Sequence, residues 1–258
     1  MKNAITAATV AFLCMGCAMG SPIAENRRPT SPDRCVYLAD RRIVYTGHTG
    51  IGLGKCLDEA HIPEIRELRI TSHGGDAWQT LQVVERYSGK IDLVTVDRWC
   101  NSSCANYVIP AAKQLAVLPH SYVIVHGSLD HDAIQRIRRS ENSQRHAFRR
   151  EHPGIPVRVF DEAFQRMMAK LGTEGAAQDA FEKRRLSCRG WLHPTGYVSR
   201  EVAEGKLDAK AKNAKGIVVT KGMAERCLKH TEILEYWSPN SQNDLPKSLR
   251  LKGAFLGP

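Results

Sequence analysis

The stretch Leu68-Arg69-Ile70-Thr71-Ser72-His73-Gly74-Gly75-Asp76 decides the fold, because a short apolar strand in it ends at two glycines. A Gly-Gly turn after a strand lets main-chain N–H groups face a ligand without obstruction by side chains. Apolar residues then recur at helical spacing over 77–87, and the apolar run 91–96 predicts the next strand. Because strands and helices keep alternating up to residue 125, we expect an α/β layout with a parallel sheet.

Two later segments carry residue types that suit acyl transfer. Cys100-Asn101-Ser102-Ser103-Cys104 places two serines where a strand meets a buried helix expected over 103–112. A serine at a helix N-terminus is accessible, and neighbouring N–H groups can stabilise an oxyanion there. His126 follows a strand expected at 122–125, where its ring can accept a proton from a serine. Each feature alone is commonly structural, since such a serine is often only a helix cap. Their order predicts an acyl-transfer site.

In this order the motifs resemble the proteolytic subunit of Clp protease and its wider crotonase-like superfamily, in particular the exported Clp-like proteins of bacterial envelopes. The resemblance runs over residues 41–209. It rests on Arg42-Ile43-Val44-Tyr45-Thr46-Gly47, Ile70-Thr71-Ser72-His73-Gly74-Gly75, Ser102-Ser103-Cys104-Ala105, Leu118-Pro119 with His126-Gly127, and Val202-Ala203-Glu204-Gly205-Lys206-Leu207-Asp208. It implies an α/β, Clp/crotonase-like fold, which is a mostly parallel β-sheet with flanking helices. Such a fold hosts many chemistries, so it does not fix the activity.

The resemblance makes Ser103 the nucleophile and His126 the general base. The N–H groups of Gly74 or Gly75, together with that of Cys104, would then form the oxyanion hole. Ser102 competes for the role of nucleophile. We prefer Ser103 because Cys104-Ala105 follows it as Met-Ala or Met-Gly follows the serine of the family.

The acidic third member of the family's triad has no good counterpart in this chain. Asp179 and Glu182 are the candidates, and Glu174 is a poorer one. Without a carboxylate to orient it, the tautomer of the histidine is less controlled and catalysis is slower.

The N-terminus has the pattern of a secretory signal peptide: a charged start, an apolar middle and a cluster of small residues. The apolar run is shorter than the roughly 20 residues that span a bilayer. We expect a signal peptide at 1–20, a linker at 21–33, a Clp/crotonase-like domain at 34–220 and a partly mobile C-terminal extension at 221–258. Cleavage before Cys17 with attachment of a lipid is the alternative to cleavage before Ser21.

Cysteine usage agrees with export. Two of the eight cysteines lie in the leader, and the remaining six are Cys35, Cys56, Cys100, Cys104, Cys188 and Cys227. An even number in an exported chain predicts disulfides, although six cysteines allow 15 pairings. Cys100 and Cys104 are close enough to pair with each other, and a free thiol at Cys104 is the weaker alternative. Among these six cysteines the CxxC spacing of zinc sites is absent, so we expect no metal.

Composition sets the limits on function. The chain has 258 residues, a net charge of +10 and 42% hydrophobic residues, which excludes intrinsic disorder and low-complexity classes. No nucleic-acid-binding motif accompanies the basic charge, so we expect no nucleic acid as partner. We expect a periplasmic or secreted serine peptidase-like hydrolase without cofactor or ATP, acting on peptides or unfolded proteins. A non-catalytic envelope binding protein with a degenerate triad is the alternative, and the resemblance allows a homo-oligomer.

Four further segments carry expectations of secondary structure. The alternation over 35–45 predicts one strand, and the arginine-rich segment 134–150 predicts one basic helix. Amphipathic spacing predicts separate helices over 160–171 and 176–183. Residues 223–236 are expected to be helical, and the polar segment 238–258 to be mobile.

Overall fold

A computed structural model describes residues 33–127, 131–188, 191–192, 203–204, 216–251 and 254–257. The predicted signal peptide, the lipid-anchor candidate Cys17, the linker up to residue 32 and most of the late motif at 202–208 lie outside the described residues. Within the described part of the chain, no helix is long and apolar enough to cross a membrane.

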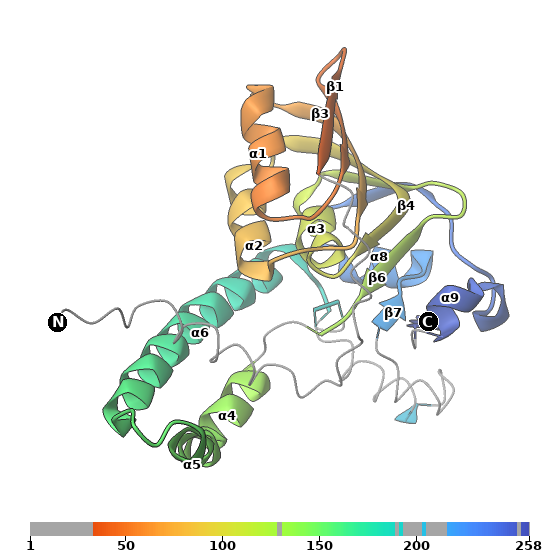
Figure 1. Cartoon of the computed structure of the whole chain (residues 1–258). Helices are drawn as coiled ribbons and strands as arrows, with labels where there is room; N and C mark the ends of the chain where they lie inside the picture. Colours follow the sequence, from red (N-terminus) through yellow and green to blue (C-terminus); the bar gives the residue numbers. More distant parts are fainter. Residues whose placement is uncertain are drawn as a thin grey trace. The chain divides into compact units, whose positions relative to one another are not determined.

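Strands from the whole described chain join one mixed sheet (Figure 1). They are β1 (Arg34–Leu38), β2 (Arg42–Thr46), β3 (Ile65–Ser72), β4 (Ile91–Asn101), β5 (Gln114–Val117), β6 (Tyr122–Val125), β7 (Gly216–Val218), β8 (Glu232–Tyr236) and β9 (Ala254–Leu256). Neighbours pair in parallel in β2–β3, β3–β4, β4–β5, β4–β6, β5–β8 and β7–β9. The pairs β1–β2 and β6–β7 are antiparallel.

Helices separate these strands and confirm the α/β class. They are α1 (Ile51–Ala60), α2 (Ala77–Arg86), the π-helix η2 (Cys104–Val108), α3 (Ile109–Ala111), α4 (His131–Arg139), α5 (Glu141–Glu151), α6 (Val157–Arg185), α8 (Lys221–Cys227), the 3-10 helix η4 (Gln242–Asp244) and α9 (Lys247–Leu251). Helices α1 and α2 lie side by side against the sheet (Figure 1). The apolar face of α1, with Leu53 and Leu57, is buried in the main core.

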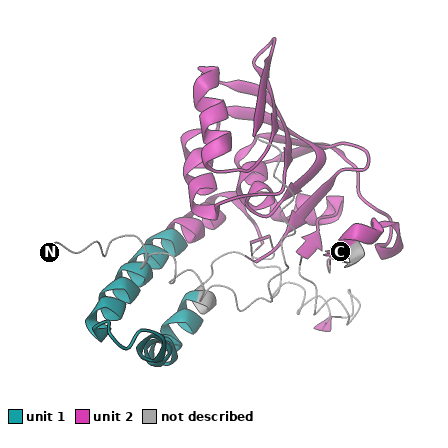
Figure 2. Cartoon of the chain, in the orientation of Figure 1, with its two compact units in different colours: residues 1–30, 129–176 teal, residues 31–128, 177–258 magenta. Residues whose placement is uncertain are grey.

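The chain divides into two compact units, which Figure 2 shows in different colours. The described part of one unit, residues 131–176, holds α4, α5 and the first part of α6, packed around Phe160, Phe164 and Met168. The other unit holds the sheet and the remaining helices. The boundary predicted at residue 220 stays a prediction, although β8 and β9 lie beyond it and belong to the same sheet.

Several predicted elements have different bounds in the structure. The single strand over 35–45 is wrong: Asp40 and Arg41, both at φ 60°, reverse the chain and divide the segment into β1 and β2. The basic segment 134–150 is broken at Ser140 into α4 and α5, whereas the two helices predicted over 160–183 form one helix, α6.

The helix predicted over 223–236 is correct only up to Cys227. The hydroxyl of Thr220 accepts a hydrogen bond from the N–H of Met223 and caps α8, which ends at Cys227. Residues 232–236 instead form β8, because pairing with β5 satisfies their main-chain groups. A long-range partner therefore overrides the local helical spacing, which sequence patterns do not reveal.

Strand β4 is the longest of the described strands and positions the candidate site. Its first half pairs with β5 and its last three residues pair with β6, with Asn101 opposite Ile124. The side chains of Val94 and Val96 on β4 are fully buried, so the strand is held in the main core. The end of β4 is thereby fixed beside the end of β6.

Candidate active site

Three strand ends meet at one edge of the sheet. Because β3, β4 and β6 run parallel to one another, their carboxyl ends share that edge. Ser72 ends β3, Asn101 ends β4 and Val125 ends β6. The Gly74-Gly75 turn, the serine pair and His126 all follow these ends directly. The motifs singled out in the sequence therefore lie at the same edge, as parallel pairing requires.

Ser102 makes the turn from β4 into the π-helix. Its φ is 57°, a left-handed conformation that a residue other than glycine adopts rarely and at a cost. Its N–H donates to the carbonyl of Ile124 at 3.0 Å, and its own carbonyl accepts from the N–H of Asn106 at 2.8 Å. The side chain of Ser102 is only half-buried and lies against the α-carbon of Gly74.

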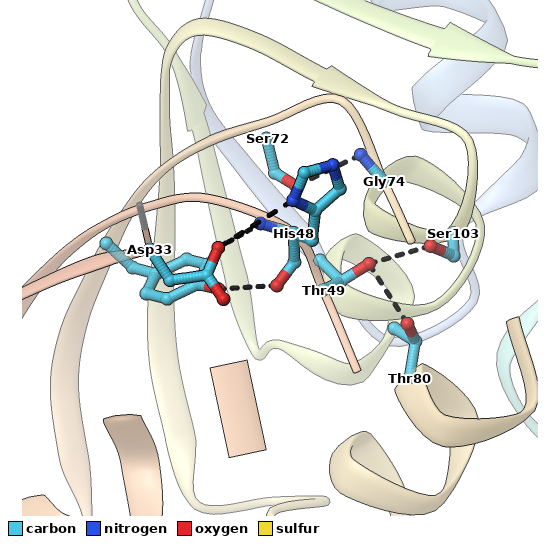
Figure 3. A network of polar contacts seen from close by, with 8 residues as sticks. Asp33, His48, Thr49, Ser72, Gly74, Thr80 and Ser103 are labelled. Carbon is cyan, nitrogen blue, oxygen red and sulfur yellow. Dashed lines mark hydrogen bonds and ion pairs between the residues drawn. The ribbon is translucent and has the colours of Figure 1, made fainter. Parts of the chain in front are cut away.

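The next residue, Ser103, has the opposite environment. It is 1% exposed, and its hydroxyl lies 2.7 Å from the hydroxyl of Thr49 and 3.1 Å from the carbonyl oxygen of Gly75. Figure 3 shows the hydroxyl of Thr49 between those of Ser103 and Thr80. Ser103 therefore faces the interior, although its neighbour Ser102 reaches the edge of the sheet.

The two glycines of the turn differ in what their N–H groups do. The N–H of Gly74 donates to the hydroxyl of Ser72 at 3.0 Å, so it already has a partner (Figure 3). The carbonyl of Gly74 accepts from the N–H of Thr49 at 3.1 Å. Because a trans peptide group directs its C=O and N–H to opposite sides, the N–H of Gly75 faces away from Thr49.

A disulfide encloses the serine pair. Cys100 and Cys104 are bonded to each other, with α-carbons 5.3 Å apart, so Cys104 is not a free thiol. The prediction of disulfides is confirmed, with Cys35–Cys56 and Cys188–Cys227 as the other pairs. Cys104 begins the π-helix, and the N–H groups in the first turn of a helix lack partners within it. The disulfide thus fixes donors next to Ser102.

His126 follows β6 and is exposed at the edge of the sheet. Its carbonyl accepts a hydrogen bond of 3.4 Å from the side-chain amide of Asn106 on the π-helix. Among the described residues, no hydrogen bond joins the His126 ring to a serine or to a carboxylate. Of the two carboxylates proposed for the triad, Asp179 is exposed, whereas Glu182 is 8% exposed. The third member of the triad stays unassigned.

A second histidine lies at the same edge. The ring of His73 stacks on that of Trp99, with centroids 4.8 Å apart. Its Nδ1 lies 3.4 Å from the side-chain nitrogen of Asn101, the residue before Ser102. The position of His73 inside the Ser-His-Gly-Gly motif was a usable signal, but the strand-end His126 took the role of base in the sequence interpretation.

Beside Gly75 a cavity of about 720 Å³ opens between the segment before β1 and the loop that precedes α1. One oxygen of Asp33 accepts from the main-chain N–H of His48 at 2.8 Å, and Nδ1 of the His48 ring lies 3.8 Å from it (Figure 3). Methyl groups at Gly47 and Gly52 would overlap this carboxylate, so the two glycines leave room for it. Burial, and then the charge and hydrogen bonding of Asp33, raise the pKa of the Tyr45 hydroxyl beside it.

Three residues of this edge were missed by the sequence analysis. Thr49 lies in the glycine-rich segment 48–54, which indicated only a turn, and Asp33 was assigned to the linker. Thr80 was one of several polar residues in a predicted helix. None of them belongs to a short motif, because their contacts join segments that are far apart in the sequence. In the ranges that the structure describes, no cluster of three metal-ligating side chains is present.

Comparisons with known proteins add little to this geometry. A scan against protein-family models and a search of the curated proteins found no match. Among solved structures, the chain is similar to a mutant ClpP1 from Listeria monocytogenes, with 17% identity and a TM-score of 0.31. The similarity covers 47% of this chain and 77% of that chain.

Proposed function

We propose that this protein is an exported serine hydrolase that cleaves peptides, with Ser102 as nucleophile and His126 as general base. The observation that carries the proposal is the contrast between the two serines. Ser102 is held at φ 57° on a strand-to-helix turn and is only half-buried, whereas Ser103 is 1% exposed. Strained backbone concentrates at functional sites, where the surrounding structure maintains it.

The protons of Ser103 favour the same choice. A carbonyl oxygen only accepts, so the contact with Gly75 takes the single hydroxyl proton of Ser103. The hydroxyl of Thr49 then donates to Ser103 at 2.7 Å. A nucleophile needs an accessible oxygen and a base for its proton, whereas Ser103 is buried and its proton is held by the carbonyl of Gly75.

The register of the sheet supports His126 as the base. The N–H of Ser102 is bonded to the carbonyl of Ile124, two residues before His126. Both side chains therefore follow strand ends that are in direct contact. Hydrogen bonds between nucleophile and base are often long or absent in a free enzyme and form in its substrate complex.

The chemistry then follows the usual two steps of acyl transfer. The His126 ring takes the hydroxyl proton of Ser102 while the oxygen attacks the peptide carbonyl carbon. The C–N bond breaks, the proton passes to the leaving amine, and an ester to Ser102 remains. Water hydrolyses this ester with His126 again as base. The N–H groups of Gly75 and Ser103 supply the oxyanion hole, since Ser103 is the residue after the nucleophile.

The three disulfides support a location outside the cytoplasm, because reducing conditions inside the cell disfavour such bonds. Export also removes the ATP that an unfoldase partner would need. We therefore propose short or unfolded peptides as substrates.

The test is to label the purified protein with a fluorophosphonate and to locate the adduct by peptide mass spectrometry. We expect an adduct on Ser102 that Ser102→Ala and His126→Ala abolish and His73→Ala retains. An adduct on Ser103 would refute our choice of nucleophile and restore the sequence-based one. Loss of labelling in His73→Ala alone would move the base to His73. A folded wild-type protein that is not labelled would refute the hydrolase and favour the non-catalytic binding protein.

A further inference from the structure

Three buried hydroxyl groups are connected by hydrogen bonds (Figure 3). They belong to Thr49 in the loop before α1, Thr80 in α2 and Ser103 at the start of the π-helix. Their exposed fractions are 3%, 0% and 1%, respectively. The hydroxyl oxygen of Thr80 lies 3.0 Å from that of Thr49, which in turn lies 2.7 Å from the hydroxyl oxygen of Ser103. A buried hydroxyl is costly unless it is hydrogen-bonded, so these contacts hold the three segments together.

The direction of the hydrogen bonds in this series follows from its end. The carbonyl of Gly75 can only accept, so Ser103 donates to it at 3.1 Å. Thr49 consequently donates to Ser103, and Thr80 donates to Thr49 or to the carbonyl of Asp76, which lies 2.7 Å away. Every hydroxyl proton has an acceptor. The series of hydrogen bonds therefore ends at the carbonyl of Gly75, which accepts the last proton.

Two consecutive peptide groups around Gly75 are thereby fixed. The main-chain N–H of Thr49 holds the carbonyl of Gly74, and the hydroxyl of Ser103 holds the carbonyl of Gly75. The N–H of Gly75 lies between these two carbonyls along the chain. It shares one planar peptide group with the Gly74 carbonyl, and the hydrogen bond from Ser103 holds the next peptide group, so both sides of the Gly75 α-carbon are restrained.

The close approach at this point also requires glycine. A methyl group on Gly75 would overlap the carbonyl oxygen of Thr49. The turn and the loop before α1 therefore contact each other through their main chains, and the hydroxyl of Thr49 adds a side-chain link from this loop to Ser103. An apolar residue at position 49 would keep the main-chain hydrogen bond to Gly74 and would remove the hydroxyl that donates to Ser103.

We propose that Thr49 and Ser103 are positioning residues that fix the direction of the Gly75 N–H as an oxyanion donor. The inference rests on the proposed function, since it assigns the connected hydroxyl groups to that reaction. The hydroxyl of Ser103 acts through Gly75 and does not touch the reacting atoms, in contrast to the main-chain N–H of the same residue. The two serines of the pair thereby have different roles, Ser102 as nucleophile and the hydroxyl of Ser103 as a support of Gly75.

The experiment compares Thr49→Val, which keeps the shape and removes the hydroxyl, with Thr49→Ser, which keeps the hydroxyl. Thr95→Val is the matched control, because Thr95 is also a buried threonine, 5% exposed, whose hydroxyl donates elsewhere, to Glu67. The rate constant for fluorophosphonate labelling of Ser102 is measured for each variant. We also measure thermal stability and the hydrogen exchange of the amide at residue 49, which donates to Gly74.

We expect Thr49→Val to slow labelling about 10-fold, since displacement of one oxyanion donor costs less than the roughly 100-fold of its removal. Labelling of Thr49→Ser and Thr95→Val should stay within about two-fold of wild type. Exchange at residue 49 should accelerate in Thr49→Val alone. A wild-type labelling rate in Thr49→Val, or an equal loss in Thr49→Ser, would overturn the positioning role.

The same measurements separate this inference from the proposed function. If the wild-type protein is labelled and Thr49→Val labels equally fast, the hydrolase stands and the positioning role fails. If the wild-type protein is not labelled, the hydrolase fails. Unchanged exchange at residue 49 in Thr49→Val would then also refute the claim that its hydroxyl fixes the turn.

Discussion

Gly74→Ala should destabilise the protein through two separate effects. Gly74 has φ 97°, where a side chain costs roughly 1–2 kcal/mol. An added methyl group would also lie 2.6 Å from the β-carbon of Ser102 and 2.8 Å from the carbonyl oxygen of Asn101. Overpacking of this kind costs typically about 1–3 kcal/mol. We therefore expect a loss of about 2–5 kcal/mol in the free energy of unfolding.

Gly89→Ala is the matched control for the first effect. Gly89 has φ 76°, and a methyl group there would meet nothing within 4 Å. Its substitution should cost only the conformational part, about 1–2 kcal/mol. Urea unfolding of both variants, followed by far-UV circular dichroism, gives the two free energies at comparable slopes.

A third variant isolates the contact with Ser102. In Gly74→Ala with Ser102→Gly, the β-carbon that the methyl group would strike is gone. The double variant should be more stable than the sum of the single changes predicts, with a coupling of about 1 kcal/mol, which is ordinary for residues in contact. If Gly74→Ala costs no more than Gly89→Ala, or if the coupling is zero, Ser102 does not lie against Gly74. The proposed site would then be wrong.

Three further predictions concern the surroundings of the site. Replacing Cys100 and Cys104 by alanines should lower the free energy of unfolding by about 2 kcal/mol, and replacing Cys35 and Cys56 should lower it by about 3 kcal/mol, because the second disulfide closes a longer loop (sequence separation 21 against 4). Only loss of Cys100–Cys104 should slow labelling of Ser102. Equal slowing by both changes would contradict a local role of this disulfide. Asp33→Ala should lower the melting temperature. Added formate should raise the melting temperature of this variant more than added chloride does, because the space beside Gly52 fits a carboxylate. Equal effects of the two salts would refute a carboxylate-binding space. Burial and Asp33 raise the pKa of Tyr45 above 10.0, so the folded protein retains a proton that the unfolded chain releases. The free energy of unfolding should therefore fall as pH rises above about 10. In urea titrations between roughly pH 9 and pH 11, the free energy of unfolding of Tyr45→Phe should fall less steeply than that of the wild type.

The edge of the sheet could be predicted because its signals are local. A strand that ends at Gly74-Gly75 and a strand that ends at a serine pair each show in a short window of sequence. Parallel pairing then brings their carboxyl ends together, as β3, β4 and β6 do. Strand β8 and the β1–β2 turn could not be predicted in the same way. Strand β8 depends on pairing with β5, about 120 residues earlier in the sequence. The β1–β2 turn depends on two non-glycine residues at φ 60°.

The contacts of Thr49 were beyond sequence reasoning for a related physical reason. A hydrogen bond between residues 49 and 103 spans 54 positions and leaves no periodic pattern. The glycine-rich composition of 48–54 indicated a turn, which holds only up to Gly50, because α1 begins at Ile51. The turn is also the place where a hydroxyl reaches the start of the π-helix, and only the packing of α1 against α2 puts it there.

The choice between Ser102 and Ser103 shows that a motif alone does not decide between two adjacent serines. Adjacent residues at a turn point in different directions, and the direction depends on one backbone angle, here φ 57° at Ser102. The spacing of the motif fits a nucleophile at either serine, whereas the backbone conformation exposes only one of the two side chains. The same closeness affects mutational tests, because Ser103→Ala would remove the hydroxyl that holds Gly75 and would lower the rate without removing a nucleophile. Loss of activity therefore cannot separate the two serines, but the position of a covalent adduct can. An adduct that remains on Ser102 and forms more slowly in Ser103→Ala would assign both roles at once.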